Sequence, residues 1–133
     1  MLCRLMRRPL LLLVLTAVAA VAVACGSDEV KVARTSADYT GAEIFHQRCG
    51  GCHTFEAAGT QGSAENPNKR EYKDGPNFDQ RKETVDNVLY AIRNGGFSSG
   101  PMPQDIVVGK EADEVAAFIA QYSGKQAKAP AAP

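Results

Sequence analysis

The sequence of 133 residues contains no tryptophan, only two histidines, and as many acidic residues as basic ones, 15 of each. This balance excludes the strongly basic surface that a nucleic-acid-binding domain presents. The lack of tryptophan limits the apolar volume, so a chain this short has a marginal core of its own. Such a domain needs support from a bound group, a metal or a disulfide.

A hydrophobic run long enough to cross a membrane is also missing. Leu10 to Ala24 covers about 15 residues, or roughly 22 Å of helix. The hydrocarbon core of a bilayer is about 30 Å thick. Because Arg4, Arg7 and Arg8 precede this run, residues 1–24 are predicted to be a signal peptide. The remaining chain holds 12 basic and 15 acidic residues, for a net charge of −3.

Cys25 follows Ala22-Val23-Ala24, which resembles the cleavage site of a bacterial lipoprotein. The resemblance implies cleavage before Cys25 and a lipid attached to this cysteine. An ordinary secretory signal cut at the same A-x-A-like site and an uncleaved anchor stay open as alternatives. Residues 25–38 are mostly polar and are predicted to be a flexible tether.

Cysteine is scarce, and one closely spaced pair, Cys49 and Cys52, is followed directly by His53. The pattern C-x-x-C-H is typical of a c-type haem attachment site. Each thiol can add across a haem vinyl group, and the imidazole can bind the iron. Two intervening glycines let the backbone lie close to the ring.

Three other interpretations of this cysteine pair fit the sequence less well. A zinc site needs a second pair of ligands, but Cys3 and Cys25 lie far upstream. A thioredoxin-like redox pair needs a βαβ context, which the neighbouring sequence lacks. A disulfide between Cys49 and Cys52 would leave His53 without a role. The haem interpretation is therefore favoured.

Three segments show the spacing of apolar residues that is typical of amphipathic helices. The first helix is predicted to begin with a capping box at Thr40–Glu43. Thr84 is predicted to cap the second helix, which ends at Gly95-Gly96. The third helix is predicted to begin near Lys110 and to stop at Gly124.

The connections between these helices are rich in glycine, proline and polar residues. Residues 57–75 are predicted to form a surface loop over one haem edge, with the charges of residues 69–74 in solvent. Residues 97–108 contain Gly100-Pro101-Met102-Pro103. Residues 125–133 form an Ala/Pro/Lys tail that is predicted to be disordered.

From about Tyr39 to Tyr122 the chain resembles a class I, monohaem c-type cytochrome of the bacterial type. The shared order is helix, C-x-x-C-H, loop with Gly-Pro, helix, Met-Pro loop, helix. The resemblance implies an all-α fold of about three main helices around one covalently bound haem c, in a domain that spans residues 39–124. It also implies that Gly41 and Phe45 pack against Phe118.

The same resemblance implies that His53 and Met102 are the axial ligands of the haem iron. It further implies that the carbonyl of Pro76 receives the Nδ1–H of His53, which fixes the ring. Met102 stands out on its own grounds, because it is the only methionine after the predicted signal peptide. It lies between two prolines rather than on an apolar helical stripe, where methionine usually fills a core.

Three further residues are candidates for the surroundings of the haem. His46 is the only other histidine and is expected at a haem edge or in solvent, not on the iron. Arg81 and Tyr90 are candidates for contacts to the haem propionates. The long loop between residues 57 and 73 shows no motif of the family.

An iron with both axial positions filled favours electron transfer over catalysis, and a thioether ligand raises its potential. The predicted function is single-electron transfer between a membrane donor and a terminal oxidase or reductase of a respiratory chain. We expect a bacterial, lipid-anchored protein on the periplasmic face of the cytoplasmic membrane, not an enzyme. The alternatives are a fixed electron-entry subunit of a membrane oxidoreductase complex, and a ligand-binding or peroxidase-like haem protein.

The predicted lipid anchor is tested by Cys25→Ser. We expect this variant to move to the soluble envelope fraction or to stay unprocessed, because the thiol that carries the lipid is lost, while its haem spectrum is unchanged. The measurement is membrane fractionation with and without detergent. Wild-type protein that washes off membranes without detergent would favour the plain secretory signal.

Overall fold

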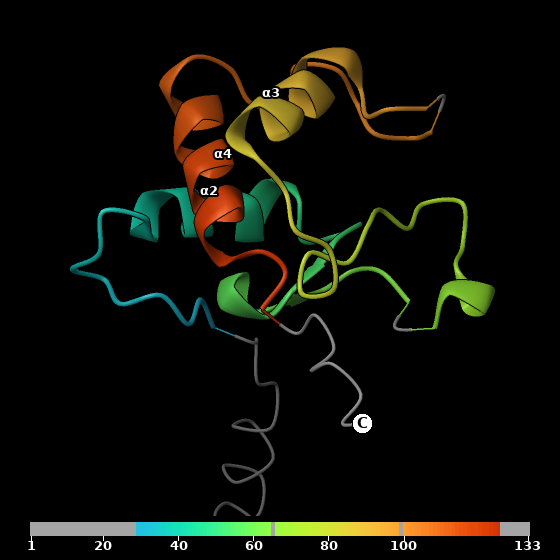
Figure 1. The fold of residues 1–133 in the computed structure, drawn as a ribbon, viewed down its shortest axis with the longest axis horizontal. Coiled ribbons are helices and arrows are strands. Elements are labelled where there is room, and N and C mark those ends of the chain that lie inside the picture. The colour runs from blue at the N-terminus through green and yellow to red at the C-terminus, as the bar shows by residue number, and fades with distance from the viewer. Residues whose placement is uncertain (1–28, 65, 99, 126–133) are drawn as a thin grey trace, which may run out of the picture.

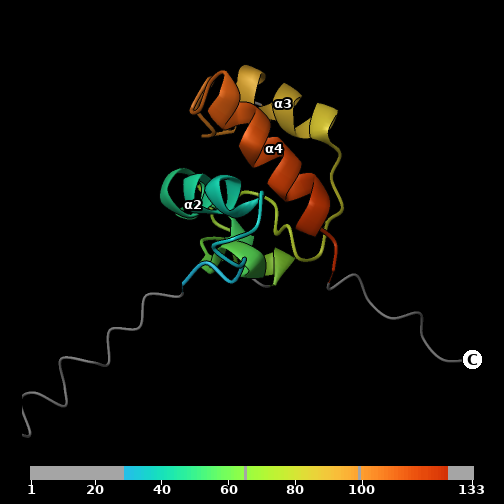
Figure 2. The same cartoon turned by 90° about the vertical axis from the view of Figure 1, so that its left-hand side faces the viewer.

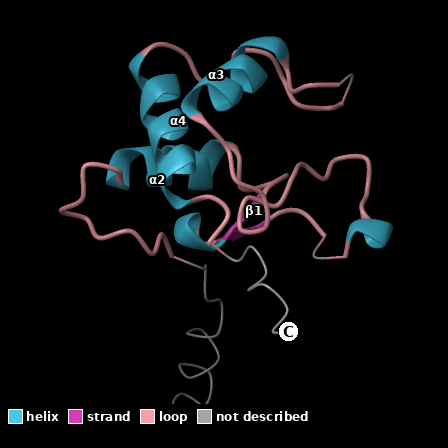
Figure 3. Cartoon of the chain, viewed as in Figure 1, coloured by secondary structure: helices cyan, strands magenta, loops and turns pink. Residues whose placement is uncertain are grey.

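The computed structural model describes residues 29–64, 66–98 and 100–125 (Figure 1). The predicted signal peptide, Cys25 and residues 126–133 lie outside the described residues. Within them, no helix is long and apolar enough to cross a membrane. The described elements are, in chain order, α2 (Tyr39–Arg48), β1 (Thr54–Phe55), η2 (Glu56–Ala58), β2 (Thr60–Gln61), η3 (Pro67–Lys69), α3 (Val85–Asn94) and α4 (Lys110–Tyr122) (Figure 3).

Helix α4 is the centre of the arrangement, because it packs against both α2 and α3 (Figure 2). It crosses α2 so closely that a Cβ on Gly41 would overlap the carbonyl oxygen of Glu114 and lie 2.9 Å from the Cβ of Phe118. The ring of Phe45 lies 6.0 Å from that of Phe118. The predicted packing of Gly41 and Phe45 against Phe118 is confirmed.

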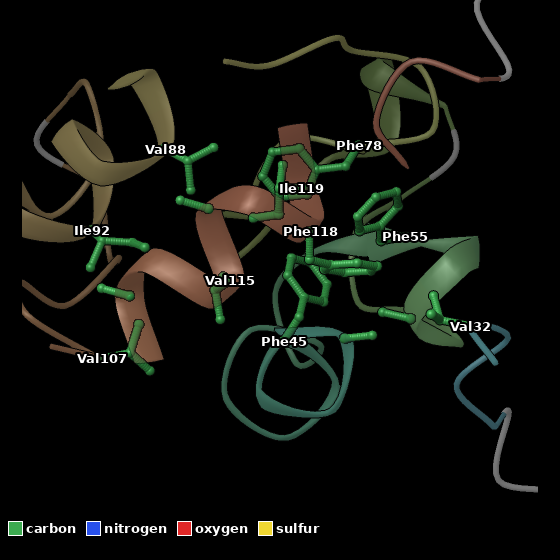
Figure 4. Packing of buried hydrophobic residues seen from close by; sticks show 14 residues of the cluster. Val32, Phe45, Phe55, Phe78, Val88, Ile92, Val107, Val115, Phe118 and Ile119 are labelled. Atoms are coloured by element: carbon green, nitrogen blue, oxygen red, sulfur yellow. The ribbon is translucent and has the colours of Figure 1, made fainter. Parts of the chain in front are cut away.

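The core has an aromatic part between α2, α4 and the chain that follows α2 (Figure 4). Phe45 contacts Phe55 at 5.3 Å and Phe78 at 5.7 Å between ring centroids, both edge to face. Burying one such side chain stabilises the fold by about 1.5–3 kcal/mol. A second, aliphatic part lies between α3 and α4 and contains Val88, Ile92, Val107, Val115 and Ile119.

The start of α2 differs from the prediction. The helix begins at Tyr39 with Asp38 as its N-cap, and no side chain caps it. The backbone of Asp38 is already helical, with φ −85° and ψ −4°. The predicted capping box at Thr40–Glu43 is wrong, because the N-cap position is occupied by Asp38 and not by Thr40. Thr40 lies inside the first helical turn instead.

The ends of the other two helices agree with the prediction. Thr84 is extended, and its side chain accepts a hydrogen bond from the backbone N–H of Asn87 at 3.3 Å. Gly95 ends α3 in the left-handed conformation, with φ 72°. Helix α4 begins at Lys110, and Gly124 follows its end with φ 75°.

The predicted surface loop 57–75 is more structured than the sequence indicated. β1 and β2 form an antiparallel hairpin with Thr54 opposite Gln61 and Phe55 opposite Thr60. Strands of two residues are too short to show an alternating pattern. Part of the predicted tether also packs on this region, since Val32 is buried and the Lys31 N–H donates to the Ala57 carbonyl at 3.0 Å.

The helix crossing predicts the effect of Gly41→Ala. Alanine gains about 1 kcal/mol of helix propensity, but it forces a Cβ against the α4 backbone, which no rotamer change relieves. Overpacking of this kind costs about 1–3 kcal/mol, so after the gain in propensity we expect a net loss of up to about 2 kcal/mol in the free energy of unfolding. Urea unfolding measures it.

The matched control is Gln47→Ala, because Gln47 is an exposed residue of the same helix and lies outside the haem motif. We expect its unfolding midpoint to stay near that of the wild type. Equal stability of the Gly41 and Gln47 variants would contradict the close crossing of α2 and α4.

Candidate functional site

The C-x-x-C-H segment forms a tight turn directly after α2. The Cys49 N–H donates to the Phe45 carbonyl at 2.8 Å, which continues the helix by one step. The backbone N–H groups of Cys52 and His53 both donate to the Cys49 carbonyl at 3.1 Å. This turn leaves Cys49 half-buried and Cys52 exposed, and both thiols are free.

Strand β2 packs against this turn, together with the next residue, Gly62. A Cβ on Gly50 would lie 2.6 Å from the Thr60 side chain, and one on Gly62 would lie 2.7 Å from the Cys52 nitrogen. The Thr60 hydroxyl also donates to the His53 carbonyl at 3.0 Å. Gly50 is therefore needed for packing within the protein, whereas the face of Gly51 is open.

The His53 ring is held on several sides. Its Nδ1 donates to the Pro76 carbonyl, 3.0 Å away, and a Cβ on Gly75 would lie 2.5 Å from that nitrogen. The Phe78 ring is stacked on the imidazole, with 5.0 Å between centroids and 19° between planes. Because Nδ1 carries the proton, Nε2 keeps its lone pair for a metal.

The electrostatics of the turn suit metal binding and not thiol redox chemistry. Burial lowers the pKa of His53, the Pro76 carbonyl opposes part of this shift, and Arg70 adds to it, so the imidazole is neutral at pH 7. Burial, followed by the charge of Cys52, raises the pKa of Cys49 to about 12. Redox-active cysteine pairs have lowered pKa values instead.

A cavity of about 370 Å³ opens beside this turn. Its volume falls in the range of about 300–1,000 Å³ that is typical of small-molecule sites. The cavity brings together Cys49, Cys52, His53, Pro76 and Met102, which the sequence analysis had named from three separate segments. Its apolar walls come from α2, α3, α4 and the loop before α3, and include Phe45, Phe78, Val88, Ile92, Val115 and Ile119.

These residues fit a covalently bound haem. Two thiols, one neutral imidazole and one thioether line a mainly apolar cavity, which is the donor set that a c-type haem needs. Met102 is half-buried and packs against the core from the segment after α3. His46 does not line the cavity, because its Nδ1 lies 2.8 Å from the Ala58 carbonyl oxygen.

The rim of the cavity carries more positive charge than the sequence analysis recognised. Arg81, a candidate for a propionate contact, lines the cavity, but its guanidinium pairs with the buried carboxylate of Glu83. Tyr90 does not line the cavity. The basic lining residues that the sequence analysis did not name are Arg48, Arg70 and Lys73. Arg48 directly precedes Cys49, and this position was the one available signal.

Asp74 organises the loop that leads to the Gly75-Pro76 pair. Its carboxylate accepts hydrogen bonds from the backbone N–H of Glu71 at 3.0 Å and of Ala64 at 3.1 Å, and from the Lys73 ammonium at 3.0 Å. Its side chain is 3% exposed. The prediction that the charges of residues 69–74 lie in solvent is therefore wrong for Asp74.

The Arg70 guanidinium also contacts the backbone of the Gly75-Pro76 pair. It donates to the Gly75 carbonyl at 2.7 Å and lines the cavity. The Gly75 N–H in turn donates to the Cys52 carbonyl at 2.8 Å. The long loop therefore ends in a set of contacts that hold the backbone of Gly75 and Pro76 against the His53 ring.

The fold and the donor set define a small, mostly helical haem protein. The sequence model of the cytochrome c family matches residues 39–123. Among solved structures, the crystal structure of the c-type cytochrome SorU from Sinorhizobium meliloti is 30% identical, covers 67% of this chain and 93% of that chain, and gives a TM-score of 0.48. The comparison with curated proteins found no match.

The chain therefore belongs to the cytochrome c family. The predicted small, mostly helical fold is thereby confirmed, with one short hairpin added. So is the predicted cofactor, a covalently bound haem c. Membership also makes the protein an electron carrier whose partners are redox proteins in general.

The contacts of Asp74 predict a pH-dependent stability. The Glu71 N–H, then the Lys73 ammonium, lower the pKa of Asp74 from 3.8 to about 2 in the folded protein. A lowered folded pKa contributes stability above the ordinary pKa, and this contribution is lost as the pH falls through about 2. Wild type should therefore melt at a higher temperature than Asp74→Asn above about pH 4.

The measurement is the melting temperature of both proteins between about pH 2 and pH 7, where we expect the two curves to converge at the acid end. Glu71→Gln is the control, because the Glu71 side chain is 72% exposed and should matter little at any pH. A constant difference between wild type and Asp74→Asn across the range would contradict the role of the ionised carboxylate.

Proposed function

We propose that Cys49 and Cys52 bind haem c through thioethers and that His53 and Met102 are the axial ligands of its iron. The observation that carries this proposal is that all four side chains line one cavity, although Met102 is separated from the other three by α3. The carbonyl of Pro76 acts behind His53, where it fixes the ring orientation and the tautomer.

When bound, the haem supplies one-electron redox chemistry. With His53 and Met102 both bound to the iron, no coordination position would be left for a substrate, which favours electron transfer over peroxidase chemistry. The neutral thioether of Met102 favours the ferrous state and so raises the reduction potential. The apolar residues of α3 and α4 that line the cavity limit the access of water to the haem, which also raises the reduction potential.

We further propose that the protein carries electrons on the periplasmic face of the bacterial cytoplasmic membrane, anchored by a lipid on Cys25. The support is the predicted signal peptide and the lipoprotein-like sequence Ala22-Val23-Ala24. Its partners would be a membrane electron donor and a terminal oxidase or reductase of a respiratory chain. A fixed electron-entry subunit of a membrane complex is the alternative, and it would co-purify stoichiometrically with that complex in mild detergent.

The ligand set is tested by Met102→Ala. The wild-type ferric protein should be low-spin and show a sulfur-to-iron band in the near infrared, and its ferrous form should bind carbon monoxide poorly. The alanine variant should lose the band, bind carbon monoxide readily and have a lower potential, by a fraction of the about 0.8 V that axial ligands span. Spectroscopy and redox titration measure these changes.

Met102→His is the matched control. It restores a sixth ligand, so it should resist carbon monoxide while its potential stays low. Rapid carbon monoxide binding by the wild type, without the near-infrared band, would overturn the six-coordinate carrier and favour a ligand-binding or catalytic haem protein.

A further inference from the structure

Met102 lies in the segment 96–105, whose described residues form backbone hydrogen bonds to α3 at the two ends of the segment. At one end the Gly96 N–H donates to the Ala91 carbonyl, and at the other the Asp105 N–H donates to the Ile92 carbonyl, both at 2.8 Å. Among the described residues between these ends, the one backbone hydrogen bond is local, from Gly100 to Ser98. The part that bears Met102 therefore needs side-chain contacts to keep its place.

Met102 itself lies beside the C-terminal end of α3. A Cβ on Gly95 would lie 2.8 Å from the Met102 carbonyl oxygen, and one on Gly96 would lie 3.9 Å from the Met102 sulfur. The segment thus folds back over the end of the helix (Figure 1). Any contact between α3 and the start of this segment bears directly on the position of the sulfur.

One such contact is an aromatic stack at the surface. The rings of Tyr90 and Phe97 are 5.1 Å apart and nearly parallel, at 25°. Tyr90 belongs to α3 and is 51% exposed, while Phe97 belongs to the segment, is 60% exposed and lines the cavity. Tyr90 is held by the helix, so it offers a rigid surface to a less constrained partner.

We propose that Tyr90 is a positioning residue, whose stack with Phe97 holds the segment closed and keeps the Met102 sulfur in place. This inference rests on the proposed function, because it assumes that Met102 is an iron ligand. An external ligand can bind only in the open state. Its apparent affinity is therefore proportional to the fraction of protein in which the segment is open. Loss of an aromatic stack changes such an equilibrium by about two- to twelve-fold.

The experiment is an imidazole titration of the ferric holoprotein, followed by loss of the near-infrared sulfur-to-iron band. Tyr90→Ala should bind imidazole about two- to twelve-fold more tightly than wild type, because the segment opens more often. Tyr90→Phe keeps the ring and should match the wild type. Tyr72→Ala removes a ring that is 79% exposed and outside the cavity lining, so it should also match the wild type.

Phe97→Ala removes the other ring and should have an effect similar to that of Tyr90→Ala. The double variant should show little further change, because either single variant already breaks the stack. If Tyr90→Ala does not fold, Phe97→Ala serves as the test in its place. Melting curves show whether each variant is folded. A double variant whose effect is the product of the two single effects would overturn the coupling between the rings.

The outcomes separate this inference from the proposed function. If the wild-type protein lacks the sulfur-to-iron band, Met102 is not a ligand and both proposals fail. If the band is present but Tyr90→Ala binds imidazole like the wild type, only the role of the stack fails. If Tyr90→Phe also binds imidazole more tightly than the wild type, the effect comes from the Tyr90 hydroxyl, and the proposed role of the stack is wrong.

Discussion

The contact on which the site depends is that between the His53 ring and the backbone at Gly75 and Pro76. The imidazole lies so close to Gly75 that no side chain fits there, and its Nδ1 is committed to the Pro76 carbonyl. This leaves one nitrogen, in one orientation, for the iron. The loop contacts of Asp74 and Arg70 matter because they hold this backbone in place.

The aromatic core and the haem cavity share the same side chains. Phe45 packs on Phe118 at the crossing of α2 and α4, and Phe78 stacks on His53, yet Phe45 and Phe78 both line the cavity. A domain this small buries too little surface to be robust by itself. The haem therefore completes the core as well as supplying the redox centre, so stability and function depend on the same packing.

Local patterns predicted the parts of the site that lie within a few residues of each other. The C-x-x-C-H turn and the cap at Thr84 were found because their interactions span three or four positions. Thr40 was misassigned because the helix already begins at Tyr39, with Asp38 as its N-cap, and the capping pattern at Thr40–Glu43 does not reveal this earlier start. The hairpin was missed because its strands have two residues each.

The sequence by itself determined the haem motif and the resemblance that implied Met102 and Pro76 as its partners. It also determined the ends of α3 and α4, because glycine and capping residues act on the backbone of their immediate neighbours. Only the tertiary structure decided which charged side chains reach the cavity. Arg70 and Lys73 line it and Tyr90 does not, so these two residues replace Tyr90 as candidates for contacts to the haem propionates. It also decided that Tyr90 stacks on Phe97. These contacts depend on the path of irregular segments, and no local pattern encodes that path.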